Sequence, residues 1–147
     1  MAESVKALVM HNLEEVLRDI PELGSVHRWQ GGVIDLDLVP LPALYFWEEQ
    51  EERQRRNRLA LGVLSMHLQV YIPLSPAGAA SFSKVADTLQ GKIHNALVRT
   101  AALKGLVENL QEGKFEPVFP NDIWGILTLT FTLTYGHAWG DAFTTTY

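Results

Sequence analysis

An unbroken alternation of apolar and threonine side chains runs from Leu127 to Tyr135. Successive side chains of a β-strand point to opposite faces, so a period of two predicts a strand with one face toward a core. We expect this strand to extend from Ile123 to Ala138, about 50 Å at ~3.3 Å per residue. Its predicted core face carries Leu127, Leu129, Phe131, Leu133 and Tyr135, and its other face carries Thr128, Thr130, Thr132 and Thr134.

A strand of this length is about twice the usual one. A small domain seldom needs so long a strand for its own core. An unpaired strand edge also exposes backbone groups that can pair with another chain. The sequence therefore predicts a protein that assembles.

Length and composition narrow the class of protein. The 147 residues fit one domain spanning residues 1–147, and the 12 basic against 17 acidic side chains give a net charge of −5. That charge repels a nucleic-acid backbone, which disfavours sequence-specific DNA binding. The absence of cysteine excludes disulfides and thiolate metal sites and suits a reducing compartment. No secretory signal and no apolar run of ~20 residues is present, so we expect no membrane partner.

Two segments have the apolar spacing of amphipathic helices. The first follows Ser4, a candidate N-cap, and continues to Ile20, where Pro21 stops it. The second begins near Ser81 and continues to about Leu106, with a possible break near Arg99.

Further strands are predicted between and after these helices. Residues 26–30 and 33–39 flank the pair Gly31-Gly32 and predict two short strands around a tight turn. Residues 43–47 predict an interior strand, and residues 59–72 predict its partner. Turns are expected at residues 111–114 and 121–122. The fold class is therefore α+β: a single mixed or antiparallel sheet packed against two or three helices, with a long C-terminal strand and a charged hairpin loop.

The charged loop lies between the two central strands. Its acidic residues come first and its basic residues follow: Glu48, Glu49, Glu51, Glu52, Arg53, Arg55, Arg56 and Arg58. Several acid–base pairs fall at the i to i+4 spacing that stabilises a helical turn by ~0.2–0.5 kcal/mol each. We expect either a loop that becomes helical on contact with a partner or a solvated hairpin tip whose charges discourage aggregation.

Residues that could carry chemistry are sparse. The histidines at positions 11, 27, 67, 94 and 137 have no metal-ligand spacing on a common helix. Asp35 and Asp37 would point to one side of a strand, as a divalent-metal pair does, although a solvated strand face is the preferred interpretation. The chain has neither a phosphate-binding loop nor a nucleophile elbow. The sequence thus predicts no catalytic residue, no cofactor and no metal ligand.

Three segments carry a resemblance to a known family. They are residues 42–47, where one predicted strand begins, residues 69–73, where its predicted partner ends, and the last strand, which ends at Tyr135 before Trp139-Gly140-Asp141. With the order of helices and strands, they resemble the tail terminator proteins of long-tailed bacteriophages, also called minor tail proteins of the head–tail joining region.

The resemblance implies a non-enzymatic virion protein that forms a hexameric ring at the head-proximal end of the tail tube. Such a ring stops tube polymerisation and offers a surface for head–tail joining. Its partners would be its own copies, the tail tube protein and a head–tail connector or neck protein. DNA would pass through the lumen without specific binding. The resemblance also implies a projecting hairpin, so the candidate interface consists of the charged residues above together with Trp139 and Asp141.

Two other classes stay open at this point. One is a different neck component, such as a head-closure or adaptor protein, which would share the ring but contact the portal side. The other is a small ligand-binding or enzymatic α+β domain, for which a deep pocket lined by Asp35, Asp37 and a histidine would be decisive.

Overall fold

A computed structural model of the chain describes residues 4–56, 58–74, 79–102, 107–121 and 123–138. The elements in chain order are α1 (Val5–Arg18), β1 (Ser25–Arg28), β2 (Ala43–Arg56), β3 (Leu59–Pro73), α2 (Ala79–Ala101), β4 (Val107–Val118) and β5 (Trp124–Ala138). The strands form one mixed sheet in the order β1-β2-β3-β5-β4. Strand β1 pairs with β2 in parallel, and all the other pairs are antiparallel. The α+β class predicted from the sequence is confirmed.

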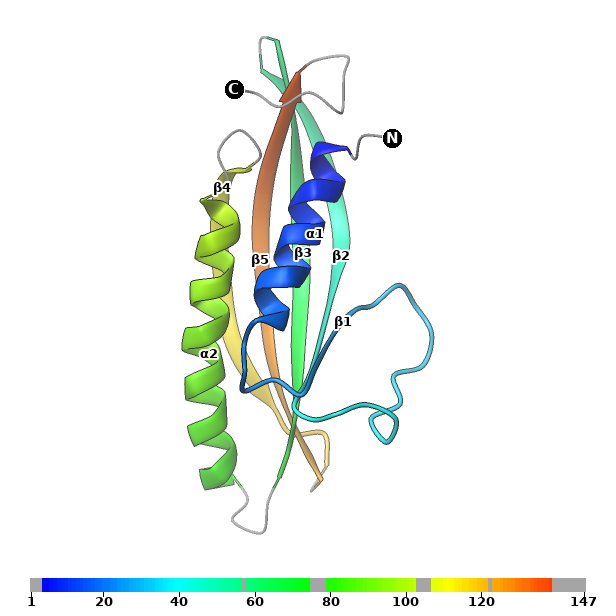
Figure 1. Ribbon diagram of the computed structural model, residues 1–147, viewed down its shortest axis with the longest axis vertical. Helices are drawn as coiled ribbons and strands as arrows, with labels where there is room; N and C mark the ends of the chain where they lie inside the picture. The colour runs from blue at the N-terminus through cyan, green and yellow to red at the C-terminus, as the bar shows by residue number, and fades with distance from the viewer. Residues whose placement is uncertain (1–3, 57, 75–78, 103–106, 122, 139–147) are drawn as a thin grey trace.

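Both helices lie along one face of the sheet (Figure 1). Helix α1 begins where the side chain of Ser4 accepts a hydrogen bond from the N–H of Ala7, at 3.1 Å. The apolar stripes of α1 and α2 join the inward-facing side chains of β2, β3 and β5 in one buried core. No helix among the described residues is long and apolar enough to cross a membrane.

Strand β5 confirms the prediction made from its alternation. Leu127, Leu129, Phe131, Leu133 and Tyr135 are all buried at 3% exposure or less, whereas the four threonines are partly or fully exposed. The prediction that this strand has an unpaired edge is wrong, however. Strand β5 is an interior strand, hydrogen-bonded to β3 on one side and to β4 on the other. Its length is matched by β2 and β3, so it needs no second chain.

The charged segment is also not a loop and not a helix. Strand β2 continues through it to Arg56, and β3 begins at Leu59, so the two strands form one long hairpin. A bulge between Glu48 and Gln50 shifts the register, after which the pairing runs from Gln50–Ser65 to Arg56–Leu59. The predicted i to i+4 helical pairs therefore do not form. Of the two expectations, the hairpin is the one realised.

Strand β4 was missed by the sequence analysis, which expected a turn at residues 111–114. A second register shift, between Glu112 and Phe115, lets β4 bend at this point and continue. A Cβ on Gly113 would collide with the backbone oxygen of Thr130, so only glycine fits the bulge.

Two smaller expectations need correction, and one cannot be compared with the structure. Residues 33–39 form no strand but belong to an irregular loop. Gly31 and Gly32, at φ +106° and +93°, make the chain turn away from β1 there. Helix α2 passes Arg99 without a break and ends at Ala101. The last predicted helical residues, 103–106, lie outside the described residues.

Candidate assembly interface

The hairpin of β2 and β3 forms one end of the molecule, beyond the start of α1 (Figure 1). Strand β1 pairs with β2 only from Ala43 to Phe46. Within the described residues, the outer edge of β2 is therefore unpaired from Trp47 to Arg56. The candidate interface residues from Glu48 to Arg56 lie along this edge.

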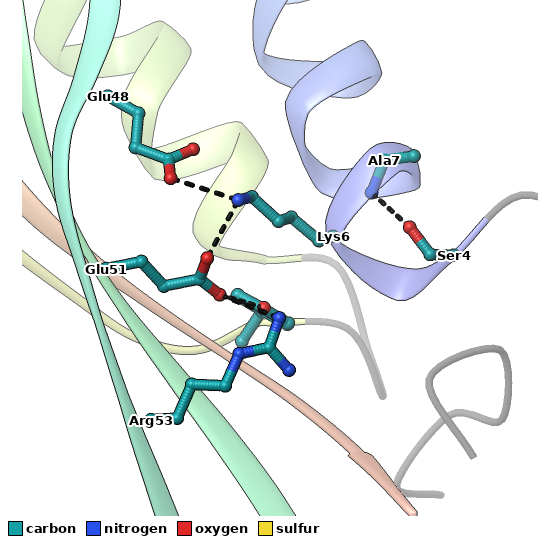
Figure 2. Close-up of polar contacts among 7 residues, drawn as sticks. Ser4, Lys6, Ala7, Glu48, Glu51 and Arg53 are labelled. Atoms are coloured by element: carbon teal, nitrogen blue, oxygen red, sulfur yellow. Dashed lines mark hydrogen bonds and ion pairs between the residues drawn. The ribbon is translucent and has the colours of Figure 1, made fainter.

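Lys6 ties the base of the hairpin to the first turn of α1. Its ammonium Nζ lies 3.0 Å from Glu48 Oε1 and 2.9 Å from Glu51 Oε2 (Figure 2). Two carboxylates from one strand thus hold one cation from the helix. They also offset the cost of a positive charge near the positive end of the helix dipole.

Tyr135 anchors the same cluster from β5. Its hydroxyl donates to Glu51 Oε1 at 2.5 Å, although the residue is only 1% exposed. The ring has room because its partner in the β3–β5 register is Gly62, where a Cβ would overlap the ring. Glu51 therefore joins β2 to both α1 and β5.

The pKa values of the cluster follow from these contacts. Burial alone would lower the pKa of Lys6, but hydrogen bonds to Glu51 and Glu48 outweigh it and the pKa is raised above 10.5. Burial would likewise raise the pKa of Glu51, but hydrogen bonds from Tyr135 and Lys6 lower it below 4.5. For Tyr135, burial and the Glu51 carboxylate both raise the pKa. All three groups keep their neutral-pH protonation state across a wide pH range.

A second anchor lies nearer the tip. Arg56 Nη2 donates to both carboxylate oxygens of Glu108, at 2.9 and 2.7 Å. Arg56 belongs to β2 and Glu108 to β4, and β3 and β5 lie between these strands in the sheet. The ion pair therefore links β2 to β4 across the sheet, with the Arg56 side chain 59% exposed.

The other predicted interface residues differ in their contacts. Glu49 Oε1 lies 3.3 Å from His67 Nδ1. Arg53 Nη2 lies 3.4 Å from Glu51 Oε1, with the Arg53 side chain 64% exposed. Glu52, Arg55 and Arg58 are exposed. Trp139 and Asp141 lie outside the described residues. The structure thus separates an anchored set (Glu48, Glu51, Arg56) from an outward set of exposed side chains (Glu52, Arg53, Arg58). Arg55 is also exposed but has a contact of its own.

Sequence reasoning missed Lys6, Tyr135 and Glu108. A lysine in the first turn of a helix opposes the helix dipole, and this could have suggested a nearby acidic partner. A buried tyrosine usually finds a partner for its hydroxyl, which could have suggested Tyr135. Glu108 gave no such signal, because the strand that carries it was not predicted.

The residues considered for chemistry do not converge on a site. Asp35 Oδ1 accepts a hydrogen bond from the backbone N–H of Asp37 at 3.0 Å, as in an Asx-turn. In the part of the chain that the structure describes, no three His, Asp or Glu side chains come close enough to hold a metal ion. His67 stacks on Trp47 with ring centroids 4.6 Å apart, on the sheet face opposite the helices.

Comparison with known proteins does not identify a family for this chain. No family model and no curated protein matches the sequence. Among solved structures, a chain of the "Virion of native gene transfer agent (GTA) particle" is similar, with 14% sequence identity over 90% of this chain and 95% of that chain. The TM-score is 0.40, so this likeness carries no conclusion about fold or function.

Proposed function

We propose that this protein is a structural virion protein of the tail terminator type. Copies would form a hexameric ring at the head-proximal end of a phage-type tail tube, stop tube polymerisation and provide the surface for head–tail joining. The observation that carries the proposal is the anchored hairpin. It supplies the projecting charged element that the resemblance to tail terminators leads one to expect.

The anchoring matters because an interface arm works best when it is ordered before binding. Lys6 and Tyr135 fix the base of the hairpin through Glu51, and Arg56 fixes its outer part through Glu108. The hairpin then loses its conformational entropy when the chain folds and not when two subunits associate. The outward charges are left to meet a neighbouring subunit or the tube.

The overall charge supports the same function. A ring that encloses moving DNA must not bind phosphates, and a chain with a net charge of −5 repels them. DNA would therefore pass through the lumen unbound. The partners of the chain would be further copies of itself, the tube protein and a connector or neck protein.

The first experiment is deletion of the coding sequence from the genome that carries it, followed by electron microscopy of the particles. A terminator predicts overlong tails without heads. Tails of normal length that fail to join heads would identify a head-closure or adaptor protein instead. Normal particles would overturn the proposed function altogether.

A second experiment addresses the hairpin. Reversing Arg53 and Arg58 to Glu should leave the melting temperature within a few degrees, because exposed ion pairs contribute only ~0–1 kcal/mol. The variant should nevertheless fail to complement the deletion. The matched control reverses Lys84 and Lys114, which are exposed on α2 and β4; it should complement normally. Complementation by both variants would show that the hairpin tip makes no essential contact.

A further inference from the structure

The loop between β1 and β2, residues 29–42, exposes large apolar side chains. Val33 is 97% exposed and Leu38 is 79% exposed. A loop this long without regular structure is uncommon in a small domain and usually functional. These two side chains make little contact with their own chain, so their burial requires a different surface.

A hollow of about 480 Å³ lies between the end of α1 and the C-terminal half of α2. Its wall combines apolar Ile20, Pro21 and Val98 with polar and charged side chains, namely Asp19, Lys92, Asn95 and Arg99. Val98 is 47% exposed, unusually high for an apolar residue on a helix that packs on a sheet. The volume is within the range of ordinary binding pockets and can receive side chains of a loop tip.

The charges of the loop and the hollow are complementary. Asp35 and Asp37 are exposed, and neither carboxylate forms an ion pair with a described residue. Arg99 is exposed and likewise unpaired within the described ranges, and Lys92 lies 3.5 Å from Glu22. Asp19 is the opposing charge at the rim. The acidic loop with Val33 and Leu38 is therefore complementary to a hollow of mixed polarity, in which Arg99 is the cation that has no ion pair with a described residue.

The loop and the hollow lie on different sides of α1, because the hollow is between α1 and α2. In Figure 1 the loop projects from the β1 side, away from α2. The loop of one copy consequently cannot fill its own hollow but is placed to reach that of a neighbour. A contact between two different surfaces repeats in one direction, and it closes into a ring when the rotation permits.

Direct pairing of strand edges between copies is less favoured. The free edge of β2 carries a bulge and a row of charges. The free edge of β4 carries two register shifts and Pro117. Bulges, charges and proline are the features by which natural sheets prevent edge-to-edge association.

We propose that the loop of residues 29–42 in one copy occupies the α1–α2 hollow of a second copy. This inference rests on the proposed ring and specifies its subunit contact. Val33 and Leu38 would pack against Val98 and Pro21, which are the exposed apolar residues of the lining. Asp35 and Asp37 would face Lys92 and Arg99.

Cross-linking tests this contact directly because the chain has no native cysteine. Leu38→Cys and Val98→Cys variants are prepared separately, mixed, and treated with a short flexible bis-maleimide. The mixture should give a covalent dimer, and each variant alone should give none. A chain with both cysteines should give a ladder that ends at the number of subunits in the ring.

The possible outcomes distinguish an error in the proposed subunit contact from an error in the proposed function. A ring that forms by light scattering but gives no Leu38–Val98 cross-link overturns the contact and leaves the ring intact. Self-cross-linking of either single variant overturns it as well, because the interface would then be two-fold. A chain that stays monomeric both in solution and in assembled particles overturns the contact and the proposed ring together.

Charge reversal provides an independent readout. Asp35→Lys with Asp37→Lys should weaken association about tenfold or more, and Lys92→Asp with Arg99→Asp should do the same. Mixing the two reversed chains should restore association between them. The control Asp87→Lys with Glu116→Lys makes the same change in net charge at exposed positions on α2 and β4 and should have no effect. The contact would be contradicted if each reversed chain associated more weakly and the mixture of the two did not regain association.

Discussion

At the scale of single residues, Tyr135 joins the core to the charged hairpin. Its ring fills the space beside Gly62, and its hydroxyl reaches the carboxylate of Glu51. Glu51 in turn holds Lys6 of α1. A partly buried carboxylate is costly unless it is hydrogen-bonded and paired, and Glu51 is both.

Gly62→Ala should destabilise the fold because the added Cβ would overlap the Tyr135 ring. We expect a loss of about 1–3 kcal/mol, typical of overpacking. The control is Gly91→Ala in α2, where a Cβ would meet no atom within 4 Å. That change should stabilise the chain by about 0.5–1 kcal/mol, since alanine favours a helix. Denaturant titration measures both, and equal shifts in the same direction would contradict the assigned packing.

The Glu51 cluster predicts a specific dependence of stability on pH. The pKa of Glu51 is lower in the folded state than its ordinary value of 4.5. Its contribution to stability is therefore complete above that value and is lost as the pH falls through the folded pKa. Glu51→Gln should lower the free energy of unfolding by about 1–3 kcal/mol at pH 7. The loss should shrink in acid, as followed by urea titrations at several pH values.

A control for this experiment is Glu15→Gln. The Glu15 side chain is 62% exposed, and among the described residues its ion pair is with the equally exposed His11. We expect almost no change at any pH. A pH-independent loss for Glu51→Gln would mean that its charge is not what stabilises the hairpin.

At the scale of elements, the two faces of β5 have different energetic roles. Phe131 is 3% exposed in the core, whereas Thr130 is exposed on the opposite face. Phe131→Ala should cost about 3–5 kcal/mol through the cavity it leaves. Thr130→Ala should cost under ~1 kcal/mol. Similar losses for the two variants in a denaturant titration would refute the assignment of faces.

The charged part of β2 is a strand even though glutamate, glutamine and arginine have little preference for strands. Pairing with β3 and anchoring through Lys6 and Glu108 override this local preference. Beyond Phe46 the strand has a partner on one side only within the described residues. Slow-exchanging amides should therefore alternate with fast-exchanging ones from Gln50 to Arg56 in hydrogen-exchange NMR. A continuous protected stretch would instead indicate a helix, and uniformly fast exchange would indicate a loop.

At the scale of the whole molecule, the two ends of the long sheet differ in chemistry. The hairpin end is charged, whereas Phe119 and Ile123, in the turn between β4 and β5 at the other end, are apolar and exposed at 49% and 61%. The loop of residues 29–42 and the α1–α2 hollow are likewise different surfaces, and a contact between two different surfaces is head-to-tail and not two-fold. We expect light scattering at high concentration, and cryo-microscopy of tails, to show a ring of six copies. A two-fold dimer in the particle would contradict this prediction.

Much of the fold followed from local pattern. The alternation in residues 127–135 and the helical spacing after Ser4 predicted β5 and α1 correctly, because each pattern reports which side faces a core. The charged hairpin could be located from the two strands around it. Its residues could not be assigned contacts, because Lys6, Tyr135 and Glu108 are far away in the sequence.

The sequence by itself determined the class of fold, the identity of the core faces and the position of the charged segment, since these depend on periodicity along the chain. Only the tertiary structure decided that β5 is interior, that the charged segment is a strand and that β4 exists. Strand order and register depend on hydrogen bonds between distant segments, and a local pattern carries no information about which neighbour supplies them. The same reason explains why the exposed loop of residues 29–42 and the hollow between α1 and α2 could be identified only in the folded molecule.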